Sequence, residues 1–237
     1  MTNNNAEKIW CVVPAAGIGS RMLTDCPKQY LPFQSSTVLD TTISRLLASQ
    51  QIEKLVVCLR EADNYWPKSA YASHNKVIVA AGGEQRADSV LNGILAFKEH
   101  AGPDDWVLVH DAVRPCVKTS DIEFLIQRAL EIQQGAILAA PIHDTIKQVN
   151  NDVSVNTVDR SHLWRALTPQ LFKLLDLEQA LLTARANNVQ VTDEASAIEQ
   201  FDKPVHIVEG STDNIKITSP GDLSLAGFYM QQQEVNS

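Results

Sequence analysis

The segment Ile9-Trp-Cys-Val-Val13, with Pro14-Ala-Ala-Gly-Ile-Gly-Ser-Arg-Met22 directly after it, indicates which fold this chain adopts. A run that is apolar at every position predicts a strand covered on both faces, and the small residues after it predict a tight loop. Similar apolar runs occupy residues 54–59, 76–80, 106–109 and 136–140. Amphipathic helical patterns lie between them at residues 38–49, 87–100 and 120–134, the last capped by Thr119 or Ser120. Alternating strands and helices predict an α/β fold with a doubly wound, mostly parallel sheet.

The composition limits the function classes that the chain can serve. Its 237 residues are 44% hydrophobic and 20% charged, enough to bury a sizeable core, and we interpret residues 1–237 as one domain with a β-arm at about 141–168. The net charge of −8 and the pI of about 5.2 lack the basic surplus that binds a nucleic-acid backbone, so we expect no nucleic-acid partner. No apolar run approaches the roughly 20 residues of a membrane span, so we expect a cytoplasmic protein without membrane contact.

The four cysteines do not form a metal-binding pattern. Cys11, Cys26, Cys58 and Cys116 are far apart, without a C-x-x-C pair or a nearby His at ligand spacing. Cys11 and Cys58 lie in the apolar runs that predict strands, where a reduced thiol behaves as a small hydrophobic side chain. We therefore expect buried thiols and no zinc site.

The middle of the chain interrupts the alternation of strands and helices. Residues 145–149 and 153–158 predict a β-hairpin around the polar turn at 150–152. An isolated two-stranded hairpin is only marginally stable in water. We expect it to project from the domain and to gain stability by packing on another subunit; a plain surface flap is the alternative.

The loop after the first strand carries the strongest local signal of a binding site. Ala15, Ala16, Gly17 and Gly19 allow the backbone to approach a ligand closely, with N–H groups that face phosphate oxygens. Arg21 and Lys28 follow and supply positive charge. The loop lacks the third glycine of a dinucleotide fingerprint and the Gly-Lys-Ser/Thr of a P-loop. Its alternative interpretation is a tight turn with solvated charges.

Because ligands of such sheets bind beyond the carboxyl ends of strands, the loops after Val13, Ala80 and Val109 are the expected site.

Asp111 follows an apolar strand, where a carboxylate is costly unless it meets a cation or hydrogen-bond donors. A metal ion, a ribose, substrate hydroxyls or the nearby Arg114 each satisfy that need. We expect a binding role for Asp111, and a packing role rather than a catalytic one for His110 beside it.

Several short segments together resemble one enzyme family. They are Gly82-Gly-Glu-Gln-Arg-Ala-Asp-Ser-Val90, His110-Asp-Ala-Val-Arg-Pro115, Thr157-Val-Asp-Arg160, Ala166-Leu-Thr-Pro-Gln170, Thr192-Asp-Glu-Ala-Ser196 and Asp213-Asn-Ile-Lys-Ile-Thr218. Each alone is weak, but their order and register, with the loop after the first strand, resemble the 2-C-methyl-D-erythritol 4-phosphate cytidylyltransferases over about residues 10–229. Glu84 stands where related proteins often carry Asp.

The resemblance implies a nucleotidyltransferase with a Rossmann-like fold that joins CTP to methylerythritol phosphate and releases pyrophosphate. It implies that the catalytic charges are Arg21, Lys28 and Lys216. The implied CTP site comprises Ala15, Ala16, Gly17, Gly19, Gly83, Ser89 and Asp111. The implied methylerythritol phosphate site comprises Asp111, Arg114, Thr145, Arg160, Thr168, Thr192 and Lys216. Asp111 is also the implied ligand of Mg²⁺, and the arm implies a homodimer in which Arg160 enters the neighbouring active site.

Two other functions fit part of this pattern. Ribitol-5-phosphate cytidylyltransferases share the fold and the basic loop, whereas residues 192–196 and 214–216 favour the methylerythritol enzyme. A nucleotide-binding module without turnover is the non-enzymatic alternative, and the presence of Arg21, Lys28, Asp111 and Lys216 argues against it.

Overall fold

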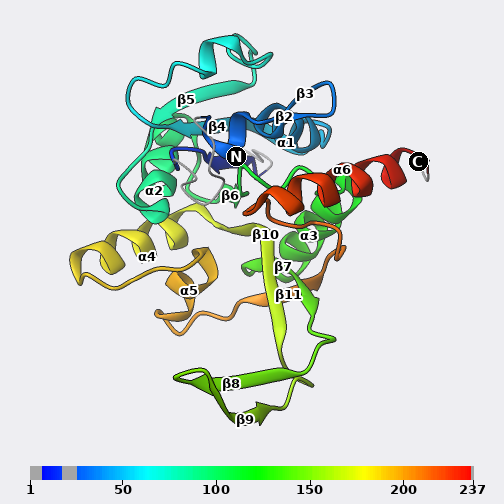
Figure 1. Cartoon of the computed structure of the whole chain (residues 1–237). Coiled ribbons are helices and arrows are strands. Elements are labelled where there is room, and N and C mark those ends of the chain that lie inside the picture. Colours follow the sequence, from blue (N-terminus) through cyan, green and yellow to red (C-terminus); the bar gives the residue numbers. More distant parts are fainter. Residues whose placement is uncertain (1–6, 18–25, 236–237) are drawn as a thin grey trace.

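A seven-stranded sheet organises the protein in a computed structural model that describes residues 7–17 and 26–235 (Figure 1). The strand order across the sheet is β11-β7-β10-β6-β1-β4-β5. The bounds are β1 Ile9–Pro14, β4 Ile52–Leu59, β5 Val77–Ala81, β6 Trp106–Val109, β7 Ala136–Pro141, β10 Trp164–Lys173 and β11 His206–Glu209. β10 runs antiparallel to β6 and β7, and the other neighbours in the sheet pair in parallel. The predicted mostly parallel sheet is confirmed.

Helices cover both faces of the sheet, as a doubly wound fold requires. Their bounds are α1 Val38–Leu47, α2 Arg86–Phe97, α3 Thr119–Ile132, α4 Leu174–Ala186, α5 Glu194–Glu199 and α6 Pro220–Val235. Cys11 and Val13 of β1 pack in one core with α1 and α3. Trp10 and Val12 point to the opposite face and pack with α2, α4 and α5. Alternate residues of one strand thus serve two cores, which explains why the run is apolar throughout.

The predicted elements agree with the structure except at one helix start. All five predicted strands and three predicted helices are present within a few residues of the expected bounds. The expected cap of α3 is wrong: the helix begins at Thr119 with Lys118 at the N-cap position, and no side chain caps it. Thr119 and Ser120 are already inside the first turn. Both cysteines expected in strands, Cys11 and Cys58, are fully buried.

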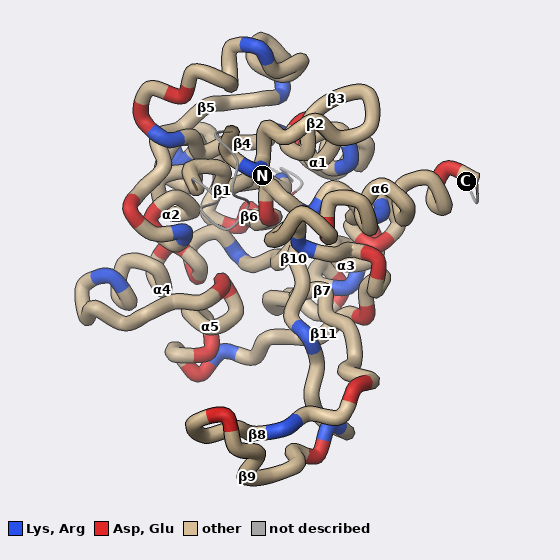
Figure 2. The backbone as a smooth tube through the Cα atoms, viewed as in Figure 1, with Lys and Arg blue, Asp and Glu red and all other residues tan. Residues whose placement is uncertain are grey.

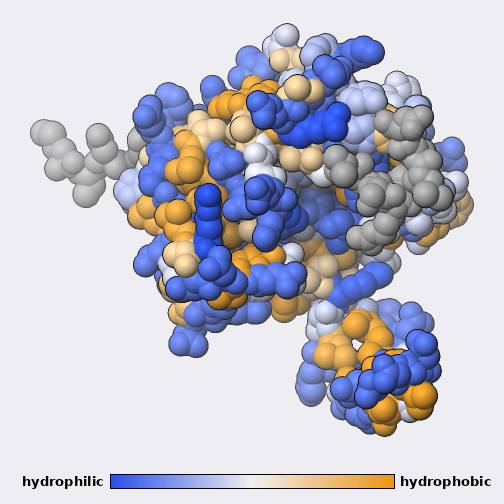
Figure 3. Space-filling model, turned by 60° about the vertical axis from the view of Figure 1, so that its left-hand side comes forward, coloured by the Kyte–Doolittle hydropathy of each residue, from blue (hydrophilic) through white to orange (hydrophobic). Residues whose placement is uncertain are grey.

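The hairpin projects from the body of the molecule as predicted, below the sheet in Figure 1. It consists of β8 Ile146–Asn150 and β9 Val153–Val158, joined by Asn151 and Asp152 with φ of 46° and 64°. Such positive φ values suit Asn and Asp in a tight hairpin turn. Val149, Val153 and Val155 are each more than half exposed. Hydrophobic side chains accordingly appear on the separate lobe at the bottom of Figure 3.

A third, smaller core brings the C-terminal part of the chain to the carboxyl ends of the strands. Val38, Val113, Ile217 and Met230 are buried together there, beside the short hairpin of β2 Pro32–Phe33 and β3 Ser36–Thr37. The backbone N–H of Ile217 donates to the carbonyl of Val113 at 2.9 Å. This contact fixes Lys216 next to the loop after β6. Single-turn helices η2 Lys28–Tyr30, η3 Trp66–Lys68 and η4 Lys98–His100 complete the described elements.

Charges are mixed along the backbone, with Lys and Arg interspersed among Asp and Glu (Figure 2). No helix within the described ranges is long and apolar enough to cross a membrane.

Candidate active site

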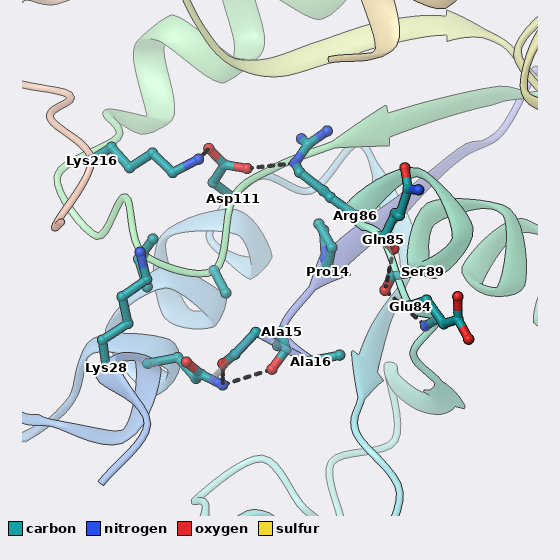
Figure 4. Close-up of a pocket in the computed structure, with 15 residues that line it drawn as sticks. Pro14, Ala15, Ala16, Lys28, Glu84, Gln85, Arg86, Ser89, Asp111 and Lys216 are labelled. Atoms are coloured by element: carbon teal, nitrogen blue, oxygen red, sulfur yellow. Dashed lines mark hydrogen bonds and ion pairs between the residues drawn. The ribbon is translucent and has the colours of Figure 1, made fainter. Parts of the chain in front are cut away.

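A cavity of about 200 Å³ opens at the carboxyl ends of β1, β5 and β6. Residues 14–17, 28–29, 83–86 and 111–113 line it, together with Ser89 and Lys216. The three strand-end loops that the sequence singled out therefore meet at one place, as the topology of open α/β sheets predicts. Figure 4 shows Lys216, Asp111 and Arg86 in a row along one side of this cavity, with Ala15 and Ala16 opposite them.

The loops after β1 and β5 are in tight contact. A Cβ atom placed on Gly82 would lie 2.3 Å from Cβ of Ala16, so only glycine permits this approach. The Gln29 side chain donates to the carbonyls of Ala15 at 2.7 Å and Gly17 at 3.0 Å, which holds the first loop from the other side. Two backbone segments suited to a flat ligand are thus fixed in place before any ligand binds.

Ser89 is buried in the first half of α2, and its hydroxyl organises the loop after β5. Its Oγ accepts a hydrogen bond from the backbone N–H of Gly83 at 3.0 Å and donates to the carbonyl of Gln85 at 3.2 Å. The Asp88 carboxylate accepts from the Gln85 N–H at 3.1 Å. Ser89 and Asp88 therefore give the loop of residues 83–85 a fixed shape along the cavity.

Asp111 is the electrostatic centre of the site. Its Oδ1 lies 3.0 Å from Nε of Arg86, and its Oδ2 lies 3.0 Å from Nζ of Lys216 and 3.4 Å from Nε of Arg114. Burial by itself would raise the pKa of this carboxyl, but the surrounding cations, Arg86 foremost, hold the pKa well below its usual range. Asp111 is therefore ionised throughout the physiological range. The ion pair between Asp111 and Arg114, which the sequence analysis gave as an alternative, does form, but Asp111 also contacts Arg86 and Lys216.

His110 is fully buried and takes part in a hydrogen-bonded ring beneath Asp111. Its Nε2 lies 3.1 Å from the carbonyl of Arg114, which can only accept, so Nε2 carries the proton. Its Nδ1 then accepts from the Thr168 hydroxyl at 3.1 Å, and the same Thr168 Oγ1 accepts from the backbone N–H of Asp111 at 3.1 Å. Burial lowers the pKa of His110 to about 4, so the imidazole is neutral. These contacts support the packing role expected for His110.

Lys28 and Lys216 reach the same end of the cavity from opposite elements (Figure 4). Nζ of Lys28 donates to the carbonyl of Ile217 at 3.1 Å, next in sequence to Lys216. Ser89 and Glu84 lie at the other end of the cavity. The arrangement separates a loop-lined end suited to a base from a cationic end suited to phosphate groups.

The structure brings together most, but not all, of the residues expected in the site. Those that line the cavity are Ala15, Ala16, Gly17, Lys28, Gly83, Ser89, Asp111 and Lys216. Arg114 and Thr168 contact Asp111 from behind it. Thr145, Arg160 and Thr192, which the structure describes, are exposed and lie outside this lining, the first two at the base of the arm. Gly19 and Arg21 lie outside the described residues.

Sequence reasoning did not single out Arg86 or Glu194. The Arg86 guanidinium donates from Nη1 to Glu194 Oε1 at 2.6 Å and from Nη2 to Oε2 at 3.0 Å. Both residues lie within segments that carried the family resemblance, but nothing local shows that these segments meet. Gln29 was also missed; its only sequence signal was its place beside Lys28.

A divalent cation fits this site only with help from a bound ligand. Among residues 7–17 and 26–235, no group of three His, Cys, Asp or Glu side chains is placed to hold a metal ion. Asp111 nonetheless offers one ionised carboxylate in the cavity. Mg²⁺ typically binds one or two carboxylates and takes its remaining ligands from substrate phosphates and water. The donor set therefore fits an ion that arrives with a triphosphate.

Comparisons with known proteins agree on one family over nearly the whole chain. A sequence profile of the 2-C-methyl-D-erythritol 4-phosphate cytidylyltransferases matches residues 9–232. The protein of that name from Vibrio parahaemolyticus is 49% identical over 234 residues, covering 98% of this chain and 99% of that protein. The corresponding Aliivibrio fischeri protein is 48% identical and covers 95% of each. The crystal structure of the Francisella tularensis cytidylyltransferase superposes with a TM-score of 0.83 at 39% identity, covering 94% of this chain and all of that one.

Proposed function

The chain belongs to the 2-C-methyl-D-erythritol 4-phosphate cytidylyltransferase family, and from this premise we propose how its residues carry out the transfer. The enzyme joins CTP to methylerythritol phosphate in the non-mevalonate route to isoprenoid precursors, giving 4-diphosphocytidyl-2-C-methyl-D-erythritol and pyrophosphate. The residue assignments rest on one observation: Lys28, Lys216 and Asp111 all line the same cavity, together with the glycine-rich loops.

The reaction needs positive charge more than it needs a base. A phosphate monoester has a second pKa of about 6, so at neutral pH the nucleophile is mostly a dianion. One of its oxygens bonds to the α-phosphorus of CTP, the bond from that phosphorus to the β-bridging oxygen breaks, and pyrophosphate leaves with the electron pair. Lys28 and Lys216, with Arg21 as a further cation of the same site, stabilise the charge that accumulates on the reacting phosphates.

The end of the cavity away from the lysines holds the nucleoside. The carbonyl oxygens of Ala15 and Gly83, together with the backbone of Ala16, offer hydrogen-bonding groups to the cytosine edge, whereas the N–H groups of Ala15 and Gly83 already donate to Cys58 and Ser89. The Ser89 hydroxyl fixes that backbone through Gly83 and Gln85. We assign Gly17 and Gly19 to the approach of the triphosphate, because small residues leave their N–H groups accessible.

Asp111 is the proposed protein ligand of a Mg²⁺ ion that enters with CTP. When bound, the ion draws charge from the triphosphate and makes pyrophosphate a better leaving group. The Asp111 carboxylate also orients Lys216, whose amine contacts it at 3.0 Å. A single ionised carboxylate supports this role, since the remaining ligands come from phosphate oxygens and water.

The phosphate and hydroxyls of the second substrate occupy the side of the site near Arg114, Thr168 and Lys216. Thr192 precedes α5 on the same side of the sheet as Glu194, whose carboxylate contacts Arg86 of the cavity. We assign Thr192 to this substrate because residues 192–196 carry the resemblance to the family.

We further propose a homodimer in which the arm of each subunit completes the other active site. Thr145 and Arg160 are exposed at the base of the arm and do not line the cavity of their own chain. The exposed valines Val149, Val153 and Val155 gain stability by burial against a second subunit. Arg160 would then offer its forked N–H groups to the substrate phosphate.

The experiment for this proposal is product analysis with the purified full chain, CTP, methylerythritol phosphate and MgCl₂. We expect mass spectrometry to detect the diphosphocytidyl product, and chelation of the metal by EDTA to stop its formation. Undiminished product formation after metal removal contradicts the Mg²⁺ assignment.

A further inference from the structure

Glu194 is a fully buried carboxylate that the reaction itself does not use. It is the first residue of α5, its exposed fraction is 0%, and both of its oxygens accept hydrogen bonds from Arg86. A buried charge of this kind is destabilising unless it is paired with good geometry. The forked contact supplies that geometry, which a lysine amine cannot copy.

Arg86 also contacts Asp111, through its Nε. Its Nε contacts Asp111 Oδ1 at 3.0 Å while Nη1 and Nη2 face Glu194. The planar guanidinium therefore lies between two carboxylates and is fixed at both edges. Both carboxylates hold the pKa of Arg86 above its usual value, against the effect of burial.

We propose that Arg86 and Glu194 form a positioning pair that fixes the Asp111 carboxylate for the transfer reaction. This inference rests on the proposed function of Asp111. Glu194 holds the guanidinium plane, and Arg86 in turn holds Oδ1 of Asp111, so that Oδ2 faces Lys216 and Arg114. We class Arg86 as a positioning residue, because its Nε, Nη1 and Nη2 atoms each already contact a carboxylate oxygen.

The charge balance gives Glu194 a second consequence. Arg86, Arg114 and Lys216 surround Asp111, and Arg86 also contacts Glu194, so these three cations and two carboxylates leave a surplus of one positive charge in this described cluster. Without the negative charge of Glu194, Arg86 is free to turn toward the phosphates of a bound substrate. Asp111 then loses its fixed contact at Oδ1, and substrate geometry becomes less favourable for reaction.

A purely structural link between α2 and α5 is the competing explanation, and the chain contains a matched control for it. Glu178 of α4 is also a buried carboxylate, and Lys98, the first residue of η4 directly after α2, contacts it at 2.5 Å. This pair connects the same layer of helices but does not line the cavity. Loss of either pair should lower stability, whereas only loss of the Arg86 and Glu194 pair should change the chemistry of the folded enzyme.

The test is steady-state pyrophosphate release by wild type, Arg86→Ala, Arg86→Lys, Glu194→Gln, the double variant Arg86→Ala/Glu194→Gln, and the control Glu178→Gln. Each kcat is normalised to the folded fraction measured by thermal unfolding. We expect Arg86→Ala and Glu194→Gln to lower kcat by about 10-fold or more, with KM for CTP changed by less than about 3-fold. The double variant should lose little more than Arg86→Ala, because the two residues act as one unit.

Two further results separate positioning from stability. Ethylguanidine should restore part of the kcat of Arg86→Ala and none of that of Glu178→Gln, and Arg86→Lys should stay impaired although it keeps the charge. Wild-type kcat in the folded fraction of Arg86→Ala and Glu194→Gln overturns the inference, as does a normalised loss of the same size in Glu178→Gln. Absence of pyrophosphate release by the wild type contradicts the proposed function itself and is thus a distinct outcome.

Discussion

The Thr168 hydroxyl lies 3.1 Å from Nδ1 of His110, and this contact joins a neutral imidazole to the backbone of the central carboxylate. The ring continues from His110 Nε2 to the Arg114 carbonyl, and from Arg114 Nε back to Asp111. With a neutral His110, every donor in the ring therefore has an acceptor, and no two donors face each other. A second proton on His110 would leave Nδ1 facing a hydroxyl that has lost its acceptor.

We predict that His110 makes the protein less stable in mild acid. Its pKa falls from the ordinary 6.5 to about 4 in the folded state. Between these values the unfolded chain binds more protons than the folded one, so the free energy of unfolding decreases as pH falls from about 6.5 to about 4. His110→Gln keeps a donor and an acceptor but does not titrate, and should remove on the order of 3 kcal/mol of this pH dependence. Urea unfolding at several pH values in this range measures the effect. If the free energy of unfolding of His110→Gln changes with pH as steeply as that of the wild type, the assignment is refuted.

Lys28→Ala should lower kcat by about 100-fold or more, because a charge directed at the reacting phosphates is lost while the sheet stays intact. Pyrophosphate release at saturating CTP measures this effect. Lys203→Ala is a suitable control, since Lys203 forms an exposed ion pair with Asp176 at 2.5 Å. Equal kcat values for Lys28→Ala and this control would show that Lys28 takes no part in the reaction.

Gly82→Ala should raise KM for CTP by about 10-fold, because its Cβ would meet Ala16 at 2.3 Å and force apart the two loops that line the cavity. Gly227→Ala in α6 is the matched control: apart from its chain neighbours and the nearby backbone of its own helix, no atom lies within 4 Å of its added Cβ. There the gain in helix propensity should stabilise the protein by up to about 1 kcal/mol and leave KM unchanged. Titration of CTP against both variants measures the difference, and an unaltered KM in Gly82→Ala contradicts the close-contact argument.

Mixed dimers test whether the arm completes a neighbouring site. Lys28→Ala and Arg160→Ala chains should each be inactive alone. After subunits re-form at random, half of the dimers are mixed and contain one intact site, so about a quarter of wild-type activity should return. No recovery, despite subunit exchange demonstrated with labelled chains, would mean that Arg160 does not act across the interface.

The central strands could be predicted from the sequence because burial on both faces makes nearly every residue of β1, β6 and β7 apolar. β10 was not predicted, because Trp164–Lys173 contains Pro169 and mixes exposed with buried positions. β11 was missed because it is short and carries His206 and Glu209 at its ends. The later helices α4 and α6 have weakly separated polar and apolar faces, so their periodicity gave little signal.

The position of the site and the types of residue in it could be predicted from the sequence. Topology places the loops after β1, β5 and β6 together, and an Asp at a strand end needs cations. The cations that Asp111 contacts depend on packing between distant segments. Lys216 lies beside Asp111 because the next residue, Ile217, packs in the third core, and Arg86 is oriented by Glu194. No local pattern contains these pairings.

The most direct test of the account is pyrophosphate release by the full chain across CTP, UTP and ATP, each with methylerythritol phosphate or ribitol 5-phosphate, in the presence of MgCl₂. We predict rapid release with CTP and methylerythritol phosphate, and kcat/KM at least about 100-fold lower for every other combination. Equal release with UTP or ATP, preference for ribitol 5-phosphate, or no turnover with any pair would contradict the assignment of this chain as the methylerythritol phosphate cytidylyltransferase.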